Sequence, residues 1–378
     1  MIENKNISYF EGLNSLRFMA AFLVVMHHTE TIRAKNALPN LNWLGLFKNG
    51  GNAVTFFFVL SGFLITYLLL KENFKTNTIS IKTFYLKRLL RIWPLYFLLV
   101  FIGTILLPQA FLWLKINYEM PYTLGQVWHY FLFFVPGLVK FYYGNHFLEP
   151  LWSIGVEEVF YLIWAPLFYI FRKKNILNLL WTVICLKLTI TALGEFWLKN
   201  DLMNYILSTF KFEAMAVGGL GAFFVFNQKG TIASHYLFKK EIQIPVYCLL
   251  ISYLLFHSNI NNIFWDLIFK TTIISQMLLN FLFLYLIISV SLVNDKWLFL
   301  RSKTLDFLGE ISYGIYMYHM LIIFAIIQFL KPWLSNQNLI TGTIVFYLIL
   351  ALLVILISAI SKLTFENFFL NLRKKKEG

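Results

Sequence analysis

Residues 12–29 read GLNSLRFMAAFLVVMHHT, which places one arginine and two histidines inside an otherwise apolar segment of membrane-spanning length. At about 100° and 1.5 Å per residue, Arg17 and His28 share one helix face about 16 Å apart along the axis, whereas His27 points about 100° away. An ionisable group inside a membrane helix is costly unless it is paired or faces water, so each is a candidate functional residue. The alternative is that Arg17 reaches the lipid headgroups and the histidines are ordinary buried residues.

The composition of the whole chain is typical of a membrane protein. Of its 378 residues, 59% are hydrophobic and only 13% are charged, whereas soluble domains are roughly 25% charged. The mean hydropathy is +0.68. The net charge of +14 does not indicate nucleic-acid binding, because basic residues in a membrane chain mark its cytoplasmic loops. Cys185 and Cys248 both lie in apolar runs, which indicates neither a disulfide framework nor a metal site.

Ten apolar runs are long enough to cross a membrane, which predicts an all-α polytopic protein. They cover 13–29, 53–70, 92–113, 155–171, 176–194, 206–226, 242–258, 268–293, 311–330 and 340–362. A further run, 124–138, is short and ends in Pro136-Gly137. If it does not cross, most loop lysines and arginines fall on the cytoplasmic side, as the positive-inside rule requires. The sequence therefore predicts a re-entrant or interfacial segment at 124–138 and two cytoplasmic termini.

The domain organisation is predicted to be simple. No interdomain linker, internal repeat or appended soluble domain is visible, so we expect one transmembrane domain over 1–378. Its basic end, 363–378, is expected to be a cytoplasmic tail. The polar start, MIENKNISYFE, does not have the pattern of a cleavable signal peptide.

A pair of carboxylates begins the fourth predicted helix. Glu157 and Glu158, in LWSIGVEEVFYLIW, are expected in its first turn, at the outer level that also holds His28. A carboxylate beside an imidazole is the pairing that a general base needs. Because adjacent helical residues diverge by about 100°, at most one of the two glutamates faces His28. The alternative is that the glutamates only favour the helix N-terminus through its dipole.

Two further groups of polar residues flank the predicted spans. Arg88 and Arg91, in KRLLRIWPLYF, share one helical face at the cytoplasmic edge of the third span. Two guanidiniums at this spacing fit a phosphate, and the alternative partner is lipid phosphate. The ninth helix begins with residues that either line a polar path or bond to neighbouring helices: Ser312, Tyr313, Tyr316 and His319. The segment NGGNAVTFFFVLSGFLI, which leads into the second span, contains four residues small enough for close helix packing: Gly50, Gly51, Ser61 and Gly62.

Five of these segments, in this order, resemble the acyltransferase-3 family of integral membrane O-acyltransferases. They are the Arg17 to His28 spacing with ten residues between, FFFVLSGFL at 56–64, RLLRIWPLY at 88–96, LWSIGVEEVFY at 151–161 and LGEISYGIYMYH at 308–319. The resemblance covers roughly 13–330. It departs from the family pattern at His27, where an aromatic or small residue is commoner, and at Val159, where glutamine is common.

The resemblance implies both an activity and the residues that carry it. The family moves an acyl group, most often acetyl from acetyl-CoA, to a hydroxyl of an extracytoplasmic carbohydrate such as lipopolysaccharide O-antigen, capsule, exopolysaccharide or peptidoglycan. Some members act on small molecules or transfer other acyl groups. Its motif residues correspond to Arg17 and His28, to the pair Arg88 and Arg91, and to Glu157.

The expected mechanism joins the two sides of the cell inner membrane. Arg88 and Arg91, with Arg17, would hold the phosphates of cytoplasmic acyl-CoA while its pantetheine arm runs along the first helix to His28. His28, oriented by Glu157 or by its neighbour Glu158, would activate the acceptor hydroxyl. Direct transfer and a transient acyl-His28 are both open. No metal and no nucleic acid is expected, and membrane lipid is an expected partner.

Two rival classes of function are weaker. A transporter or flippase for a lipid-linked sugar would also need intramembrane charges, but the two halves of the chain lack matching Gly/Pro-interrupted spans. A non-catalytic sensor or scaffold would tolerate substitution of His28. The acceptor, the acyl length and the oligomeric state are left open by the sequence.

Overall fold

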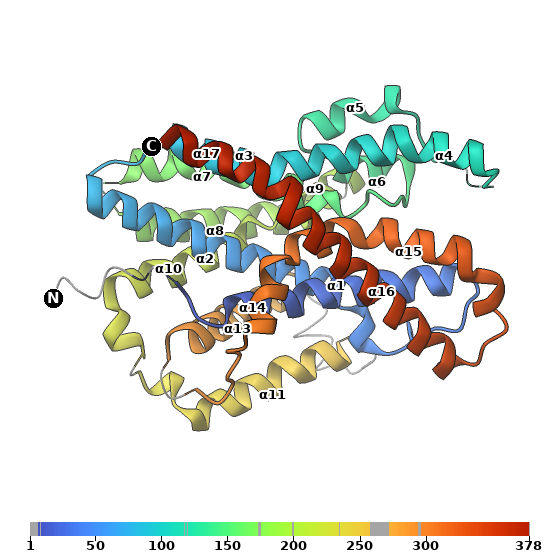
Figure 1. Ribbon diagram of the computed structural model, residues 1–378. Coiled ribbons are helices and arrows are strands. Elements are labelled where there is room, and N and C mark those ends of the chain that lie inside the picture. The colour runs from blue at the N-terminus through green and yellow to red at the C-terminus, as the bar shows by residue number, and fades with distance from the viewer. Residues whose placement is uncertain are drawn as a thin grey trace. The chain divides into compact units, whose positions relative to one another are not determined.

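The computed structural model describes residues 7–377 except 8, 117, 119, 173–174, 199, 234, 258–271 and 294–295. Within these residues all regular structure is helical (Figure 1). The chain divides into two compact units. The first contains Met1–Glu30, Leu41–Ile79 and Ala165–Glu310, and the second contains Thr31–Asn40, Ser80–Trp164 and Ile311–Gly378.

The first unit is built around the pairing of two long helices. Its helices are α1 (Leu13–Lys35, which ends in the second unit), α2 (Gly50–Thr76), α8 (Ile176–Leu193), α9 (Asp201–Thr209), α10 (Phe212–Ala233), α11 (Lys240–Phe256), α13 (Thr272–Leu292) and α14 (Lys303–Glu310). α2 packs along α10, and α8 and α13 also contact α10.

Glycines bring α2 and α10 into backbone contact. A Cβ added at Gly62 would lie 1.9 Å from the carbonyl oxygen of Met215, and one at Gly218 would lie 2.0 Å from that of Val59. Neither position has room for any side chain. The prediction that Gly62 permits close helix packing is therefore confirmed, whereas a Cβ at Gly51 would meet nothing within 4 Å.

The second unit contains the remaining helices. They are α3 (Ile81–Phe101), the π-helical turn η3 (Ile102–Leu106), α4 (Leu107–Leu114), α5 (Leu124–Leu132), α6 (Gly137–Tyr143), α7 (Leu151–Phe171, which ends in the first unit), α15 (Ser312–Leu334), α16 (Leu339–Ser361), the π-helical turn η7 (Lys362–Glu366) and α17 (Asn367–Glu377). α15 packs against α16, and α17 lies along α3 (Figure 1).

The prediction of an all-α polytopic membrane protein is confirmed. Eight stretches of described helix are long and apolar enough to cross a membrane: Gly50–Thr76, Ile81–Leu114, Leu151–Phe171, Ile176–Leu193, Asp201–Gln228, Ile273–Leu292, Ser312–Leu334 and Leu339–Leu372. The two other predicted spans are also helical, but α11 has only 17 residues and α1 carries several ionisable groups. The predicted start of the eighth run, 268–271, lies outside the described residues. α5 has nine residues, too few to cross, as expected for 124–138.

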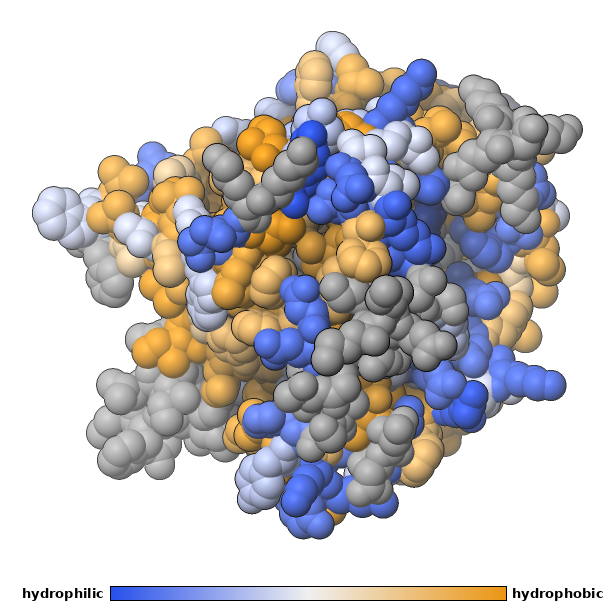
Figure 2. Space-filling model, turned by 90° about the vertical axis from the view of Figure 1, so that its left-hand side faces the viewer, coloured by the Kyte–Doolittle hydropathy of each residue, from blue (hydrophilic) through white to orange (hydrophobic). Residues whose placement is uncertain are grey.

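The outer face of α16 shows how such a helix meets lipid. Every fourth residue is an exposed large aliphatic side chain: Ile340, Ile344, Leu348, Leu352, Leu356 and Ile360. The opposite face is buried and includes Phe346, Leu350 and Val354. Apolar side chains also reach the surface between hydrophilic patches on the face drawn in Figure 2. Such surface is stable against acyl chains rather than water.

Two predicted boundaries are wrong. The predicted basic loop before the third span is mostly helical, because α3 starts at Ile81, where the Ser80 side chain accepts a hydrogen bond from the amide of Thr83. The segment after 362 was expected to be a solvated tail, but it continues as η7 and α17, and Glu366 is only 7% exposed. The side chains of 373–378 lie outside the described part.

Candidate functional site

The two adjacent histidines of α1 have different surroundings in the first unit. The ring of His27 lies against the start of α2, since a Cβ added at Gly50 would be 2.4 Å from its Cδ2 atom. Its Nδ1 is 2.9 Å from the carbonyl oxygen of Phe47, so this nitrogen carries the proton and donates it. The His28 ring meets the His27 ring edge to face at 5.2 Å between centroids. His27 therefore holds α1 against the start of α2.

Arg17 and His28 lie on one continuous helix, as expected from their spacing. α1 runs unbroken from Leu13 to Lys35, so the axial separation of about 16 Å stands. Arg17 is partly buried, and its Nη1 donates to the side-chain oxygen of Asn14 at 3.3 Å. Ser15, in the first turn of α1, donates to the carbonyl oxygen of Leu300 at 2.8 Å, which fixes this end of the helix.

In the second unit, α3 and α7 run side by side in opposite directions. The hydroxyl of Tyr85 donates to the carbonyl oxygen of Leu162 at 2.7 Å. Two turns further along α3, the indole nitrogen of Trp93 donates to Glu158 Oε2 at 2.8 Å. These two bonds set the register between the helices and place the glutamate pair beside the middle of α3.

This register brings Arg88 to the level of the glutamates. Its guanidinium lies over the ring of Tyr161 at 5.6 Å and over that of Phe84 at 5.8 Å. Tyr161 in turn donates to Glu157 Oε2 at 3.0 Å. Both Glu157 and Glu158 are within electrostatic range of Arg88. The sequence predicted Arg88 and the glutamates at opposite sides of the membrane, and this placement is wrong.

The difference has a geometric cause. Glu157 and Glu158 were expected in the first helical turn, but α7 begins at Leu151, so they lie in its second and third turns, about 10 Å along the axis. The helical run that contains Arg88 extends over 34 residues, Ile81–Leu114. At 1.5 Å per residue this is about 50 Å, well beyond the roughly 30 Å of a hydrocarbon core. A helix of this length does not fix the depth of its residues by itself.

Arg91 completes what we call the arginine–glutamate cluster: Arg88, Arg91, Glu157 and Glu158. Arg91 is exposed and makes no hydrogen bond or ion pair with the part of the chain that the structure describes. The Nε atom of Arg88 and the Oε1 atom of Glu158 are buried without a hydrogen-bond partner. The cluster therefore offers guanidinium donors and one carboxylate oxygen to a ligand.

Tyrosines from α15 surround the cluster. Tyr313 donates to the carbonyl oxygen of Ile92 at 3.0 Å and lies within electrostatic range of Arg91, both glutamates and Glu366. The Tyr316 hydroxyl is 2.7 Å from Ser153 Oγ and 3.0 Å from the carbonyl oxygen of Pro150. His319 is fully buried, with Nδ1 2.6 Å from the carbonyl oxygen of Tyr316. Tyr313 and Tyr316 thus bond to neighbouring elements, one of the two expected alternatives, whereas His319 bonds within α15.

The predicted partnership of His28 with a glutamate crosses the two units. His28 belongs to the first unit, whereas Glu157 and Glu158 belong to the second. The pairing itself stays a prediction.

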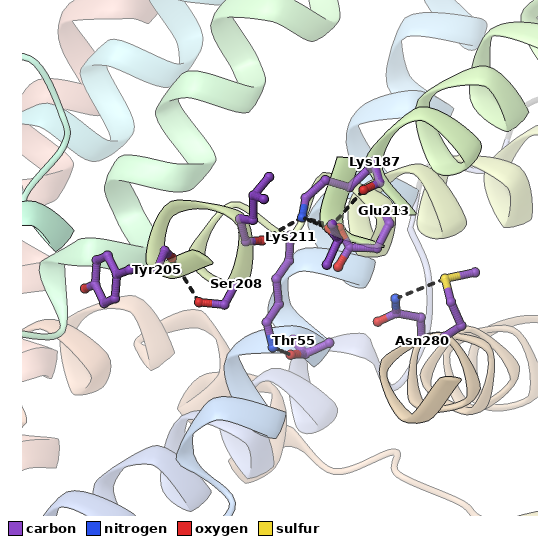
Figure 3. A network of polar contacts seen from close by, with 10 residues as sticks. Thr55, Lys187, Tyr205, Ser208, Lys211, Glu213 and Asn280 are labelled. Atoms are coloured by element: carbon purple, nitrogen blue, oxygen red, sulfur yellow. Dashed lines mark hydrogen bonds and ion pairs between the residues drawn. The ribbon is translucent and has the colours of Figure 1, made fainter. Parts of the chain in front are cut away.

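Three charged residues of the first unit were missed by the sequence analysis. Lys187 lies in α8, Lys211 lies between α9 and α10, and Glu213 lies in the first turn of α10 (Figure 3). We call these three residues the lysine cluster. They fall inside the predicted spans 176–194 and 206–226, so the rule that singled out Arg17 and His28 would have found them too.

A buried histidine precedes α7 in the second unit. The Tyr122 hydroxyl and His146 Nδ1 share a hydrogen bond of 3.0 Å, and His146 is 3% exposed. Burial, followed by the nearby charge of Lys140, lowers the pKa of His146 from 6.5 to about 3. The imidazole is therefore neutral at physiological pH and helps to hold the segment between α5 and α7.

The family of the chain follows from a comparison that covers nearly all of it. A family model described as an acyltransferase domain matches residues 10–362. This chain belongs to the acyltransferase family. The match includes all five segments that carry the resemblance in the sequence, which is thereby confirmed. The protein is a multi-pass membrane acyltransferase domain.

Curated relatives carry O-acetyltransferase names. The O-acetyltransferase OatA of Staphylococcus aureus (strain NCTC 8325 / PS 47) is 27% identical over 226 residues, which is 57% of this chain and 34% of that protein. A protein of S. aureus (strain COL), whose O-acetyltransferase name is provisional, is 25% identical over 344 residues, 87% of this chain and 52% of that protein. The chain thus spans about a third to a half of the length of these relatives. No solved structure matches it significantly.

Proposed function

We propose that this chain transfers an acyl group, foremost acetyl, from cytoplasmic acyl-CoA to a hydroxyl of an extracytoplasmic carbohydrate. Family membership and the O-acetyltransferase names of the relatives support the reaction type. The observation that carries the proposal is the arginine–glutamate cluster, a guanidinium pair inside a membrane domain. In this proposal the protein lies in the cell inner membrane with both termini in the cytoplasm.

Arg88 and Arg91 bind the donor in this proposal. A guanidinium presents a rigid fork of N–H donors that matches phosphate oxygens, and coenzyme A carries several phosphates. The rings of Tyr161 and Phe84 stabilise the charge of Arg88 without using its N–H groups. Arg17, at the start of α1, is a further cation for the same phosphates.

His28 is the general base, which the structural use of His27 favours. The imidazole takes the proton of the acceptor hydroxyl, and the oxygen attacks the thioester carbonyl carbon. The carbon–sulfur bond then breaks, and the coenzyme A thiolate takes the proton from the imidazolium. Glu157 orients the imidazole and stabilises its charged form. A two-step route through acyl-His28 uses the same residues.

The first test is donor binding, which needs no acceptor. Acetyl-CoA is titrated by calorimetry into the detergent-purified protein and into the Arg88→Ala/Arg91→Ala variant. Each charge-assisted contact is worth about 1.5–3 kcal/mol, so the double variant should bind at least about 100-fold more weakly.

A matched control removes the same charge from the same helix. The Lys82→Ala/Lys87→Ala variant should keep the wild-type affinity, because neither lysine belongs to the cluster. Equal affinity for acetyl-CoA in all three proteins would indicate that Arg88 and Arg91 contact lipid phosphate instead of the donor. No binding by the folded wild type would reject acetyl-CoA as the donor.

A further inference from the structure

The lysine cluster lies outside the five segments that carry the family resemblance, yet it is held within the membrane-spanning part of the first unit. Lys187 belongs to the candidate span Ile176–Leu193, and Lys211 and Glu213 belong to Asp201–Gln228. Figure 3 shows Lys187 and Glu213 close together, with Lys211 extending from them toward Thr55 of α2. Two ammonium groups thus share one carboxylate.

Lys187 is bonded within the protein. Its Nζ donates to Thr191 Oγ1 at 2.9 Å and to the carbonyl oxygen of Leu207 at 2.6 Å. It also forms an ion pair with Glu213 Oε2 at 3.9 Å, an oxygen that accepts no hydrogen bond from the residues that the structure describes. The side chains of Lys187 and Glu213 are 11% and 4% exposed, so they form a buried, balanced pair.

Lys211 is left with excess charge and free donors. Its Nζ donates to Thr55 Oγ1 at 2.8 Å, and within the described residues it has no other hydrogen bond or ion pair. The Thr55 hydroxyl donates its own proton to the carbonyl oxygen of Gly51 at 3.0 Å, which turns a lone pair toward Lys211. Lys187 and Lys211 share the single carboxylate of Glu213, so the lysine cluster keeps one excess positive charge, and an anion beside Lys211 would be favoured. Lys211 is partly buried.

The start of α2 relates Lys211 to the histidines of α1. Gly50 packs against the His27 ring, and Thr55 follows it by five residues, about 7.5 Å along the helix axis. Lys211 therefore lies at the end of α2 that contacts His27, the neighbour of the proposed base His28.

We propose that Lys211 forms an anion subsite for the acyl acceptor. It binds a carboxylate or phosphate of an acidic carbohydrate whose hydroxyl is presented to His28. The inference rests on the proposed function and narrows its acceptor class from carbohydrates in general to those with an anionic group. Thr55 orients the ammonium of Lys211. Lys187 pairs with Glu213, so the acceptor binds to Lys211 and not to Lys187.

Matched sugars test the subsite by binding. Glucuronate and glucose 6-phosphate are titrated into the detergent-purified protein, with glucose as the neutral control, and affinity is followed by thermal shift. The proteins are wild type, Lys211→Met, Lys211→Arg and, as a control for net charge, Lys115→Met at the exposed end of α4.

We expect the wild type, the arginine variant and the Lys115 control to prefer at least one acidic sugar over glucose by tenfold or more. Lys211→Met should lose this preference. Preference for the carboxylate over the phosphate, or the reverse, identifies the anionic group. If the methionine variant does not fold, the preference must still be present in wild type and in Lys211→Arg.

Two results would overturn the inference: no preference for either acidic sugar in the wild type, or an unchanged preference in a folded Lys211→Met protein. Acetyl-CoA binding distinguishes a failure of this inference from a failure of the proposed function. Lys211→Met should bind acetyl-CoA like the wild type, whereas Arg88→Ala/Arg91→Ala should not. A Lys211 variant that loses acetyl-CoA instead would make Lys211 a donor contact and reject the acceptor subsite.

Discussion

The arginine–glutamate cluster and the lysine cluster are both groups of charges in membrane-spanning segments, but the protein holds them in different ways. Lys187 donates hydrogen bonds to a hydroxyl and a carbonyl oxygen and forms an ion pair with Glu213. Arg88 lies over two aromatic rings, and its Nε is buried without a hydrogen bond. Ring faces stabilise a cation while leaving its N–H groups available. The difference separates charges that stabilise the fold, such as Lys187, from charges available to a ligand, such as Arg88.

The largest effect is expected at His28 in the first unit. His28→Ala should lower turnover by about 10²- to 10⁴-fold, because a general base contributes that much, while acetyl-CoA affinity stays unchanged. His27→Ala should keep most of the turnover but lower the melting temperature, since it removes the bond to Phe47. Turnover is measured as coenzyme A release. A folded His28→Ala protein with normal turnover would reject the base hypothesis. Loss of acetyl-CoA binding in this variant would contradict the assignment of donor binding to the second unit.

The glutamates of the second unit should differ from each other. Glu157→Gln should lower turnover by at least about tenfold, because a neutral amide stabilises an imidazolium poorly. Glu158→Gln should lower it less, because the carboxylate of Glu158 is already bonded to Trp93. Parallel measurements of turnover and acetyl-CoA affinity compare the two variants. The reverse order would make Glu158 the functional carboxylate.

A glycine substitution in the first unit tests the packing of α10 against α2, the helix that contains Thr55. Gly62→Ala should destabilise the protein by about 1–3 kcal/mol, because its Cβ would overlap the carbonyl of Met215. Gly51→Ala, on the same helix but with open space at its Cβ, should be neutral or slightly stabilising. Denaturation midpoints in one detergent give both values. Equal midpoints for the two variants would contradict the backbone contact.

The last effect concerns the pH dependence of stability and His146 in the second unit. Its pKa of about 3 is below the unfolded value of 6.5, so the unfolded chain binds the extra proton first. Stability should therefore be constant above about pH 6.5 and fall as the pH drops toward 3, by at most about 1.4 kcal/mol per pH unit. Melting temperatures between pH 7.5 and about 4.5 follow this, and His146→Phe should show a shallower decline. Equal slopes for both proteins would show that His146 is not the titrating group.

The helices of this protein could be predicted from hydropathy, except for the start of α3 and the last helix, α17. Every predicted run contains a helix in the described residues, because the bilayer demands continuous apolar segments. The start of α3 was missed because Lys82, Lys87 and Arg88 lower the hydropathy without disfavouring a helix, and Ser80 caps it. α17 was missed for the same reason, since its lysines resemble a solvated tail.

The candidate site was predicted residue by residue, but its arrangement was not. Loop charges indicate on which side each helix begins, and they say nothing about how far neighbouring helices are shifted along their axes. The hydrogen bonds of Tyr85 and Trp93 to α7 set that shift, and they place Arg88 beside Glu157. A contact between two side chains 65 positions apart leaves no periodic signal in one sequence.

The π-helical turn η7 (Lys362–Glu366) determines how a change of chain length at this point would affect the position of α17. A π turn holds one residue more than an α turn, so removing one residue there would restore an α-helix. The wider turn absorbs the extra residue, because about five π residues rotate and advance the chain as far as about four α residues do. Removing one residue there would therefore leave nearly the same face of α17 along α3. Removing one residue from α16 would instead rotate everything after it by about 100°. The chain can thus change in length by one residue at η7 without turning its last helix away from α3.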